Sequence, residues 1–312
     1  MSIQITKSGI LDSLQGLPKN GKQQEGFSPG GAMDIVAHAV ANALVGNKRD
    51  ATTLEMHIPA AEIVFHKETI FAFTGAANSA TLDNETVYAN QPIIVNAGSK
   101  LLFDTRANGA RIYLAVQGGF ESKKGKLLKN DVLNSVASFG YHFEGVGQLH
   151  ALTLGWTANT QEFYRSNIIR CIQGPNFTVL SKQEIDSFES KRFEIDMQSN
   201  RMGFRLNSVP ISHTVPPELL STAVTRGTLQ LTPSGQLIVL MADHQTTGGY
   251  PRIGTVISAD MPSLAQMPIG SSFKIAWISI EEAEALLLQQ ETNLQQLENA
   301  CKFRLQEYFS EK

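Results

Sequence analysis

Short apolar runs separated by turn-forming residues dominate the chain between residues 51 and 116. Pro, Asn, Asp and Gly punctuate these runs, and each of these residue types favours a turn for a known backbone reason. Strands that recur at this spacing are typical of β-sandwiches and β-barrels. The pattern therefore predicts strands at residues 54–58, 62–65, 70–73, 80–82, 93–95, 100–103 and 111–116.

The second half of the chain has a similar organisation. Residues 157–166 are polar and weakly patterned, and a chain of 312 residues is long for one core but natural for two. We therefore expect an N-terminal domain of residues 1–160 and a C-terminal domain of residues 161–312. Apolar runs predict strands in the latter at residues 168–172, 228–231, 237–242, 253–257 and 273–278.

Few stretches have helical periodicity. Residues 34–46 carry one apolar side, with Asp34 placed as an N-cap and Gly46 as a stop. Ser181 and Ser279 each begin a capping box, which predicts a short helix to about residue 189 and a long C-terminal helix. One face of that last helix is marked by Ala283, Leu287, Leu294, Leu297, Cys301, Leu305 and Tyr308.

The apolar run at residues 237–242 ends abruptly in a polar segment with paired glycines. Glycine permits positive φ and close approach of a ligand, and consecutive N–H groups in turns form an anion-binding nest. Hydroxyl and amide groups and one guanidinium add donors. The segment predicts a site for a small polar or anionic ligand, built from Asp243, Gln245, Thr246, Thr247, Gly248, Gly249, Tyr250 and Arg252.

The same composition has a purely structural interpretation. A tight connection between two strands uses the same residue types, with Asp243 and Thr246 bonding their own backbone. Arg201, in the segment at residues 199–206, likewise fits either a surface ion pair or a cation offered to an anionic ligand. The residues alone leave these alternatives open.

Composition narrows the class of protein. Hydrophobic residues make up 42% of the chain, which is ordinary for a globular protein, and charged residues only 18%, against about 25% in typical domains. Surface hidden in an interface explains the low charge, so we expect partner proteins or homo-oligomers. The net charge of −3 and the scattered basic residues argue against nucleic-acid binding.

Targeting and metal signals are absent from the pattern. The N-terminus has no apolar segment of signal-peptide length and no run reaches about 18 apolar residues, so we expect a cytoplasmic protein without membrane contact. The seven histidines show no metal-binding spacing, and we expect no metal site. His38, within the first helix, fits a buried structural role, and Cys171 and Cys301 fit ordinary packed residues.

Several blocks in order along the chain resemble the allophanate hydrolase subunit 2 family. The most specific is Gln-Thr-Thr-Gly-Gly-Tyr-Pro at residues 245–251 after an apolar strand, followed by Ala259-Asp260 and Leu264-Ala265-Gln266. Residues 199–206 are similar to a second family motif. Further blocks lie at residues 31–34, 42–47, 73–76 and 113–119, so the resemblance covers nearly the whole chain.

The resemblance implies a mainly β fold of two cyclophilin-like β-barrel subdomains, with a few helices and a long C-terminal helix. It implies one component of a hydrolase that, with ATP, opens the lactam of 5-oxo-L-proline to L-glutamate. The implied partners are a companion allophanate hydrolase subunit 1-type protein and the A component of 5-oxoprolinase. Because the chain has no Walker A motif, the ATP, with Mg²⁺, is expected at an unconventional site or one shared with a partner.

Within this interpretation the polar segment supplies the chemistry. Asp243, Gln245 and Arg252 are the candidate catalytic residues, with Asp243 either holding a metal ion through nucleotide phosphates or taking a proton from water. The candidate residues for binding substrate or phosphate are Thr246, Thr247, Gly248, Gly249, Tyr250, Asn200 and Arg201.

Two loops depart from the family pattern. Residues 15–19 read Gln-Gly-Leu-Pro-Lys where the family has an acid and an arginine, and no Gly-Ser-x-Ser-Thr-like element follows Gly119. These changes keep open a non-catalytic regulatory protein of the Kip type. A carboxyltransferase component is a third interpretation; the chain has no Met-Lys-Met biotin attachment sequence, so biotin would arrive on another protein.

Overall fold

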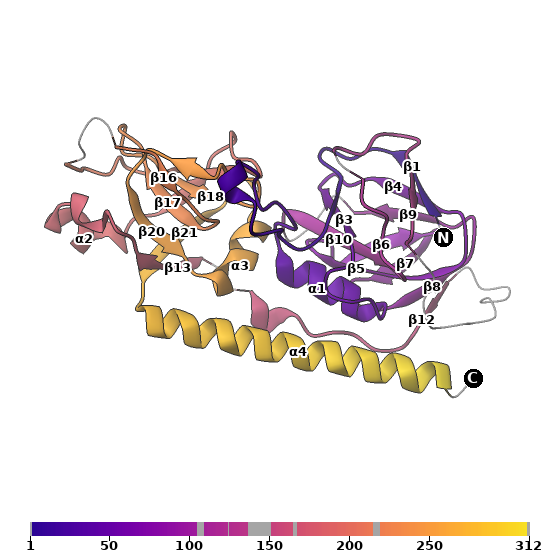
Figure 1. Ribbon diagram of the computed structural model, residues 1–312. Coiled ribbons are helices and arrows are strands. Elements are labelled where there is room, and N and C mark those ends of the chain that lie inside the picture. Colours follow the sequence, from indigo (N-terminus) through magenta and orange to yellow (C-terminus); the bar gives the residue numbers. More distant parts are fainter. Residues whose placement is uncertain are drawn as a thin grey trace. The chain divides into compact units, whose positions relative to one another are not determined.

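The computed structural model describes residues 2–104, 109–123, 125–136, 151–164, 167–214 and 219–310 (Figure 1). Its contacts divide the chain into two compact units. The first comprises Met1–Leu17, Asp34–Gln161 and Thr292–Lys312, and the second Pro18–Met33 and Glu162–Glu291. The predicted domain boundary between residues 160 and 161 stays a prediction. Each unit also contains one segment from the other side of that boundary, since residues 18–33 belong to the second unit and residues 292–312 to the first.

The first unit consists of two antiparallel sheets. One has the order β11-β1-β4-β9-β6-β7 and the other β12-β8-β5-β10-β3-β2. The strands of the first sheet are β1 (Ser2–Lys7), β4 (Glu62–Phe65), β6 (Ser79–Leu82), β7 (Glu85–Tyr88), β9 (Lys100–Phe103) and β11 (Val132–Asn134). Those of the second are β2 (Ser13–Gln15), β3 (Thr53–His57), β5 (Thr69–Gly75), β8 (Ile93–Val95), β10 (Arg111–Val116) and β12 (Ala151–Thr153).

The prediction of a closed barrel in this unit is wrong for the described residues, since neither of these two sheets closes on itself. Both sheets contribute to one buried cluster that includes Ile3, Phe65, Phe71 and Phe73. Alternation along a strand reveals which side is buried but not which strands pair, and the outer strands β11 and β12 lie far in sequence from their partners β1 and β8. The unit is therefore a pair of open sheets around a shared core.

Helix α1 (Ile35–Leu44) covers β5 and β10. Its predicted cap is confirmed, because Asp34 Oδ1 accepts a hydrogen bond from the Ala37 amide at 2.9 Å. His38 is completely buried; its Nδ1 lies 2.8 Å from Thr53 Oγ1 and its Nε2 lies 3.0 Å from the Arg49 carbonyl oxygen. The expectation of a structural histidine at this position is thus supported by its contacts.

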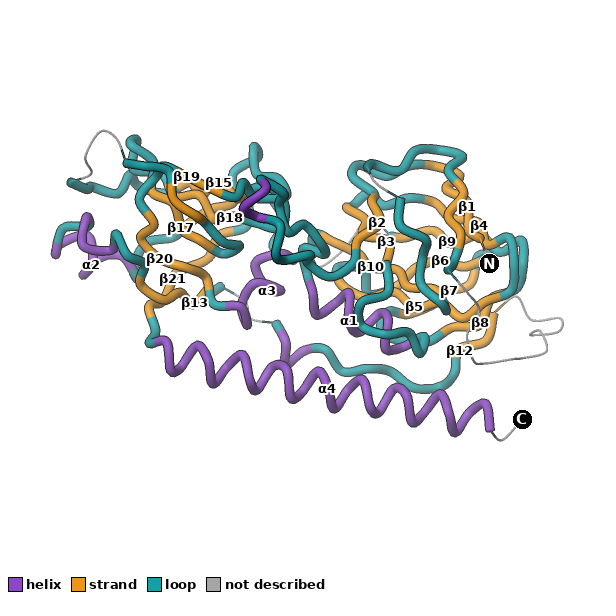
Figure 2. Tube along the Cα trace, in the orientation of Figure 1, coloured by secondary structure: helices purple, strands orange, loops and turns teal. Residues whose placement is uncertain are grey.

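The second unit contains a closed seven-stranded barrel with the order β13-β20-β17-β18-β15-β14-β21 (Figure 2). Its strands are β13 (Ile168–Gln173), β14 (Phe193–Ile195), β15 (Gly203–Asn207), β17 (Thr228–Leu231), β18 (Leu237–Leu240), β20 (Arg252–Val256) and β21 (Ser272–Trp277). Outside the barrel, β16 (Thr222–Ala223) and β19 (Thr247–Gly248) form a small ribbon. Helices α2 (Lys182–Phe188) and α3 (Met261–Gln266) belong to the same unit.

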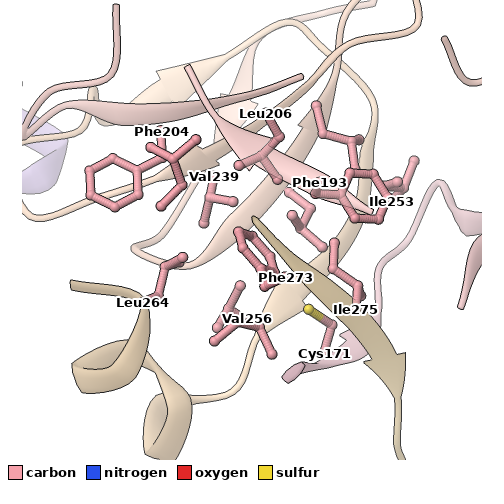
Figure 3. Close-up of a cluster of buried hydrophobic side chains, with 14 of the residues drawn as sticks. Cys171, Phe193, Phe204, Leu206, Val239, Ile253, Val256, Leu264, Phe273 and Ile275 are labelled. Carbon is pink, nitrogen blue, oxygen red and sulfur yellow. The ribbon is translucent and has the colours of Figure 1, made fainter. Parts of the chain in front are cut away.

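The barrel is filled by side chains from its alternating inward positions. Phe193, Phe204, Val239, Ile253 and Phe273 come from five different strands and lie in one cluster (Figure 3). The predicted barrel is confirmed in this half of the chain.

The last helix, α4 (Ile280–Ser310), begins with the predicted capping box, because the Glu282 amide donates to Ser279 Oγ and the Ser279 amide to Glu282 Oε2. Of its predicted apolar face, Leu294, Cys301 and Leu305 are buried, while Leu287 is exposed. Within the described residues, every helix is too short or too polar to cross a bilayer.

Both cysteines are buried and free. Burial raises the pKa of the Cys301 thiol to about 12 and holds the pKa of the Cys171 thiol well above its usual range. Neither thiol is therefore poised as a nucleophile, as expected for packed residues.

Gly254→Ala is predicted to destabilise the barrel. A Cβ at this position would lie 2.6 Å from Trp277 Cζ3 and 2.9 Å from the Ile172 carbonyl oxygen, so the indole or the strand must shift. We expect a loss of about 1–3 kcal/mol in the free energy of unfolding, measured by urea denaturation. Gly16→Ala is the control, because its Cβ would meet only the Asp50 carbonyl oxygen at 3.7 Å; equal effects of both substitutions would contradict the packing argument.

Burial of His38 predicts a loss of stability on mild acidification. Desolvation lowers the pKa of the folded imidazole from 6.5 to about 4, so the unfolded chain takes up this proton first as the pH falls. The stability that the neutral ring contributes is complete above pH 6.5 and is lost progressively down to about pH 4, by up to about 1.4 kcal/mol per pH unit.

Asp12 acts in the opposite direction, because burial raises its pKa to about 6 and folded Asp12 is therefore protonated before unfolded Asp12. The measurement is consequently a comparison of unfolding free energies of the wild type and His38→Gln between pH 4 and 7. The wild type should lose stability relative to the variant as the pH falls. Parallel pH profiles would show that His38 does not resist protonation.

Candidate functional site

Strand β18 is the predicted buried strand that leads into the polar segment. Leu237, Val239 and Leu240 are buried, as are Met241 and Ala242 after the strand, and Asp243 is the first partly exposed side chain beyond the strand. The Asp243 amide donates to the Arg201 carbonyl oxygen at 2.8 Å, which places residues 200–202 directly beside the start of the segment.

Arg201 and Asp243 form a two-point ion pair. Arg201 Nε donates to Asp243 Oδ2 at 2.7 Å, and Nη2 donates to Oδ1 at 3.0 Å. The exposed fraction of the side chain is 15% for Arg201 but 41% for Asp243, so the carboxylate remains accessible to solvent on one side. Two residues predicted separately for substrate binding and catalysis are thus brought together, and each neutralises the other.

The segment at residues 18–33 also lies against the Arg201–Asp243 ion pair. Arg201 Nη2 donates to the Gly31 carbonyl oxygen at 2.7 Å, and Ser28 Oγ donates to that of Ala242 at 3.2 Å. Arg226 donates to the carbonyl oxygens of Ala32 and Met33. Nothing in the sequence predicts that this loop lies against Asp243.

The glycine nest is not formed where the sequence predicts it. Gly248 lies in strand β19 and pairs with Thr222 of β16, while the Thr246 carbonyl oxygen accepts from the Val224 amide at 3.1 Å. An extended strand points successive amides to opposite sides, whereas a nest needs them to converge. Positive φ values in this part of the unit occur at Gly30, Gly31 and Gly227, at 61°, 85° and 86°.

Arg252 begins strand β20 and lies in register with Gln230 of β17. Its Nη1 donates to the Ala223 carbonyl oxygen at 2.9 Å, which ties the β16–β19 ribbon to the barrel wall. Gln245 Nε2 donates to Gln230 Oε1 at 3.4 Å. The predicted residues Gln245, Gly248 and Arg252 are therefore gathered around Gln230, which no sequence pattern singles out.

The other predicted residues occupy the surroundings. Asn200 Oδ1 accepts from the Met202 amide at 2.8 Å and so shapes the turn that carries Arg201. Tyr250 is 45% exposed and Thr247 is exposed, while Thr246 and Gly249 are half-buried. Whether any of these residues binds a ligand stays a prediction.

The second unit thus presents two neighbouring sets of polar groups. Arg201, Asp243 and the Gly31 carbonyl form one set, and Gln230, Gln245 and Arg252 form the other. Among the described residues, no group of three or more His, Cys, Asp and Glu side chains is arranged to hold a metal ion. Amide and guanidinium donors are suited to carbonyl, carboxylate or phosphate oxygens.

This β-barrel with a polar segment following a buried strand belongs to a known class. The carboxyltransferase domain family, comprising subdomains A and B, matches residues 25–277, and the chain belongs to this family. The match confirms the family resemblance carried by residues 245–251.

Two full-length relatives are bacterial. The chain is 34% identical to the C component of 5-oxoprolinase from Escherichia coli over 95% of this chain and 97% of the relative. It is 32% identical to the corresponding 5-oxoprolinase component of Haemophilus influenzae over 91% of this chain and 94% of the relative. These relatives therefore align with the chain almost from end to end.

A solved structure shares the fold. The crystal structure of Kluyveromyces lactis urea amidolyase superposes with a TM-score of 0.82 at 20% identity over 95% of this chain. The chain spans only 20% of that much longer protein, and the likeness concerns the fold alone.

Arg201→Ala is predicted to loosen the segment at residues 18–33. It removes two hydrogen bonds to Asp243 and one to Gly31, and because Asp243 is partly solvated we expect a loss of about 1–2 kcal/mol in stability. Trypsin should cleave the native chain faster at Lys19 and Lys22. Arg205→Ala, on the exposed side of β15, is the control. Equal cleavage of both variants would show that Arg201 does not hold residues 18–33 in place.

Proposed function

We propose that this chain is the C-type component of an ATP-dependent 5-oxoprolinase, which opens the lactam of 5-oxo-L-proline to L-glutamate. The observation that carries the proposal is the end-to-end similarity to two bacterial proteins that bear the name of this 5-oxoprolinase component, at 34% and 32% identity. The expected partners are a companion allophanate hydrolase subunit 1-type protein and the A component of 5-oxoprolinase. A cytoplasmic location agrees with the ATP dependence.

The chemistry explains why ATP is required. A lactam is a poor electrophile, so transfer of the γ-phosphoryl group to the amide oxygen provides a leaving group at the carbonyl carbon. Water then adds to that carbon, the C–N bond breaks with the proton going to nitrogen, and a second water hydrolyses the resulting acyl phosphate. The products are L-glutamate, ADP and inorganic phosphate.

The site residues are suited to individual steps of this reaction. Arg252 is a cation for the carboxylate of the substrate or for charge that develops on phosphate. Gln245 has an amide that matches the lactam, and Asp243 is a partly exposed carboxylate that accepts a proton from water or holds Mg²⁺ through nucleotide phosphates. Arg201 holds the Asp243 carboxylate in place by direct pairing at 2.7 Å.

A non-catalytic regulatory role is the second candidate. It is favoured by residues 15–19, where Lys19 stands in place of a family arginine and cannot form the same two-point contact with a carboxylate or phosphate. In that case the chain binds the companion proteins without contributing to turnover.

Arg252→Ala tests the enzymatic proposal. The chain is mixed with its companion proteins, 5-oxo-L-proline and ATP, and glutamate and ADP are measured. We expect the variant to lose about 100-fold or more in turnover because a preorganised cation is removed. Arg304→Ala, which changes an exposed arginine on α4, should retain full activity.

Two results contradict the proposal in different ways. If the complete wild-type mixture forms no glutamate, the enzymatic function is wrong. If the Arg252 and Arg304 variants are equally active and both folded, Arg252 is not part of the site.

A further inference from the structure

Gln230 is a buried amide on the outer side of the barrel wall. Its neighbours Leu229 and Leu231 are completely buried in the barrel core, so Gln230, between them on β17, faces away from that core. The residue is nevertheless only 1% exposed. Something other than the barrel must therefore cover it.

The cover is the predicted glycine segment itself. A Cβ placed on Gly248 would lie 2.2 Å from Gln230 Nε2, so β19 lies directly on the amide and no other residue fits at position 248 without a shift. Val224 Cγ1 would lie 3.5 Å from the same Cβ, which brings the residue after β16 to the same point. The β16–β19 ribbon thus lies over Gln230.

The oxygen of the Gln230 side-chain amide has a hydrogen-bond partner, whereas the nitrogen has none among the described residues. Gln230 Oε1 accepts a hydrogen bond from Gln245 Nε2 at 3.4 Å. Gln230 Nε2 is fully buried and has no hydrogen-bond partner among the described residues. A buried donor without an acceptor is unfavourable and rare in native proteins, and such an atom is a reason to look for a ligand.

Arg252 lies next to this donor. It pairs with Gln230 just after a shift in the strand register, and its Nη1 donates to the Ala223 carbonyl oxygen in the ribbon that covers Gln230, so Arg252 lies on the same side of the wall as Gln230. Paired residues on one face of antiparallel strands bring their side chains within reach of one ligand. The wall therefore presents an amide donor and a guanidinium side by side beneath the ribbon.

We propose that Gln230 is a substrate-binding residue that donates from Nε2 to a carbonyl or carboxylate oxygen of a small cyclic amide acid, beside Arg252. The proposal deepens the proposed function and rests on it. The bound carboxylate takes the place of the Ala223 carbonyl as acceptor for Arg252, because a hydrogen bond between two charged groups is stronger than one to a neutral carbonyl.

This exchange explains how a ligand reaches a covered amide. Each strand of the ribbon has only two residues, and Arg252 ties the ribbon to the wall at 2.9 Å. Short pairings outside a core open at low cost compared with the barrel itself. Binding of the anion to Arg252 releases the ribbon and uncovers Gln230.

Gln230→Met and Gln230→Glu test the assignment in the complete mixture with companion proteins. Methionine keeps the length and removes the donor, whereas glutamate replaces the donor by an anion that repels an anionic substrate. We expect the KM for 5-oxo-L-proline to rise at least about tenfold in both variants, more in the glutamate variant, with the KM for ATP unchanged. Gln296→Met, the same change on the exposed side of α4, should leave both constants unaltered.

A second measurement observes the wild-type chain and uses the Gln230→Met variant only to assign a signal. In the full-length chain labelled with ¹⁵N, addition of 5-oxo-L-proline should shift the side-chain amide signal of Gln230, assigned as the signal missing from the spectrum of Gln230→Met. The Gln296 signal, assigned in the same way, should not move.

The outcomes separate this inference from the proposed function. If the wild-type mixture forms glutamate but the KM for 5-oxo-L-proline is unchanged in both folded Gln230 variants, the role of Gln230 is wrong and the proposed function stands. If the mixture forms no glutamate, the proposed function is wrong, and an unshifted Gln230 signal then overturns the binding assignment as well.

Discussion

The parallel pairing of β13 with β21 holds the second unit together. Ile168 lies opposite Lys274 and Cys171 opposite Trp277, so the first and last strands of this unit meet and close the barrel. Closure removes two exposed sheet edges and forces alternate residues of seven strands into one interior. Because the interior takes Leu229 and Leu231 of β17, Gln230 between them faces outward. The position of Gln230 on the outer wall is a direct result.

A second constraint joins segments that are distant in sequence. The carbonyl oxygens of Gly31, Ala32 and Met33 accept hydrogen bonds from two arginines of the second unit. Met33 is also fully buried within the barrel unit's apolar cluster. These contacts explain why residues 18–33 belong to the second unit although the strands before and after them belong to the first. Arg201 therefore holds the segment at residues 18–33 as well as the Asp243 carboxylate.

Local signals in the sequence predict much of this structure, but non-local features escape them. Asp34 caps α1 and the apolar run at residues 237–242 contains strand β18, because both features depend on neighbours within a few residues. The regular spacing of short strands in the first unit does not specify which strands pair. That spacing therefore could not distinguish a closed barrel from the two open sheets. Gly248 has the composition of a nest, but pairing with Thr222 makes it a strand. Gln230 has the pattern of a solvent-facing strand residue, and only the ribbon that covers it reveals a buried amide.

The burial of both sulfur atoms has a practical consequence for experiments on this chain. Cys171 and Cys301 are the only cysteines in the sequence, and both are held as protonated thiols inside the folded units. Maleimides and similar reagents require an accessible thiolate, so the cysteines of the native protein do not react with them. A single cysteine introduced on the surface would therefore carry a fluorophore or spin label at one defined position, without removal of the natural residues.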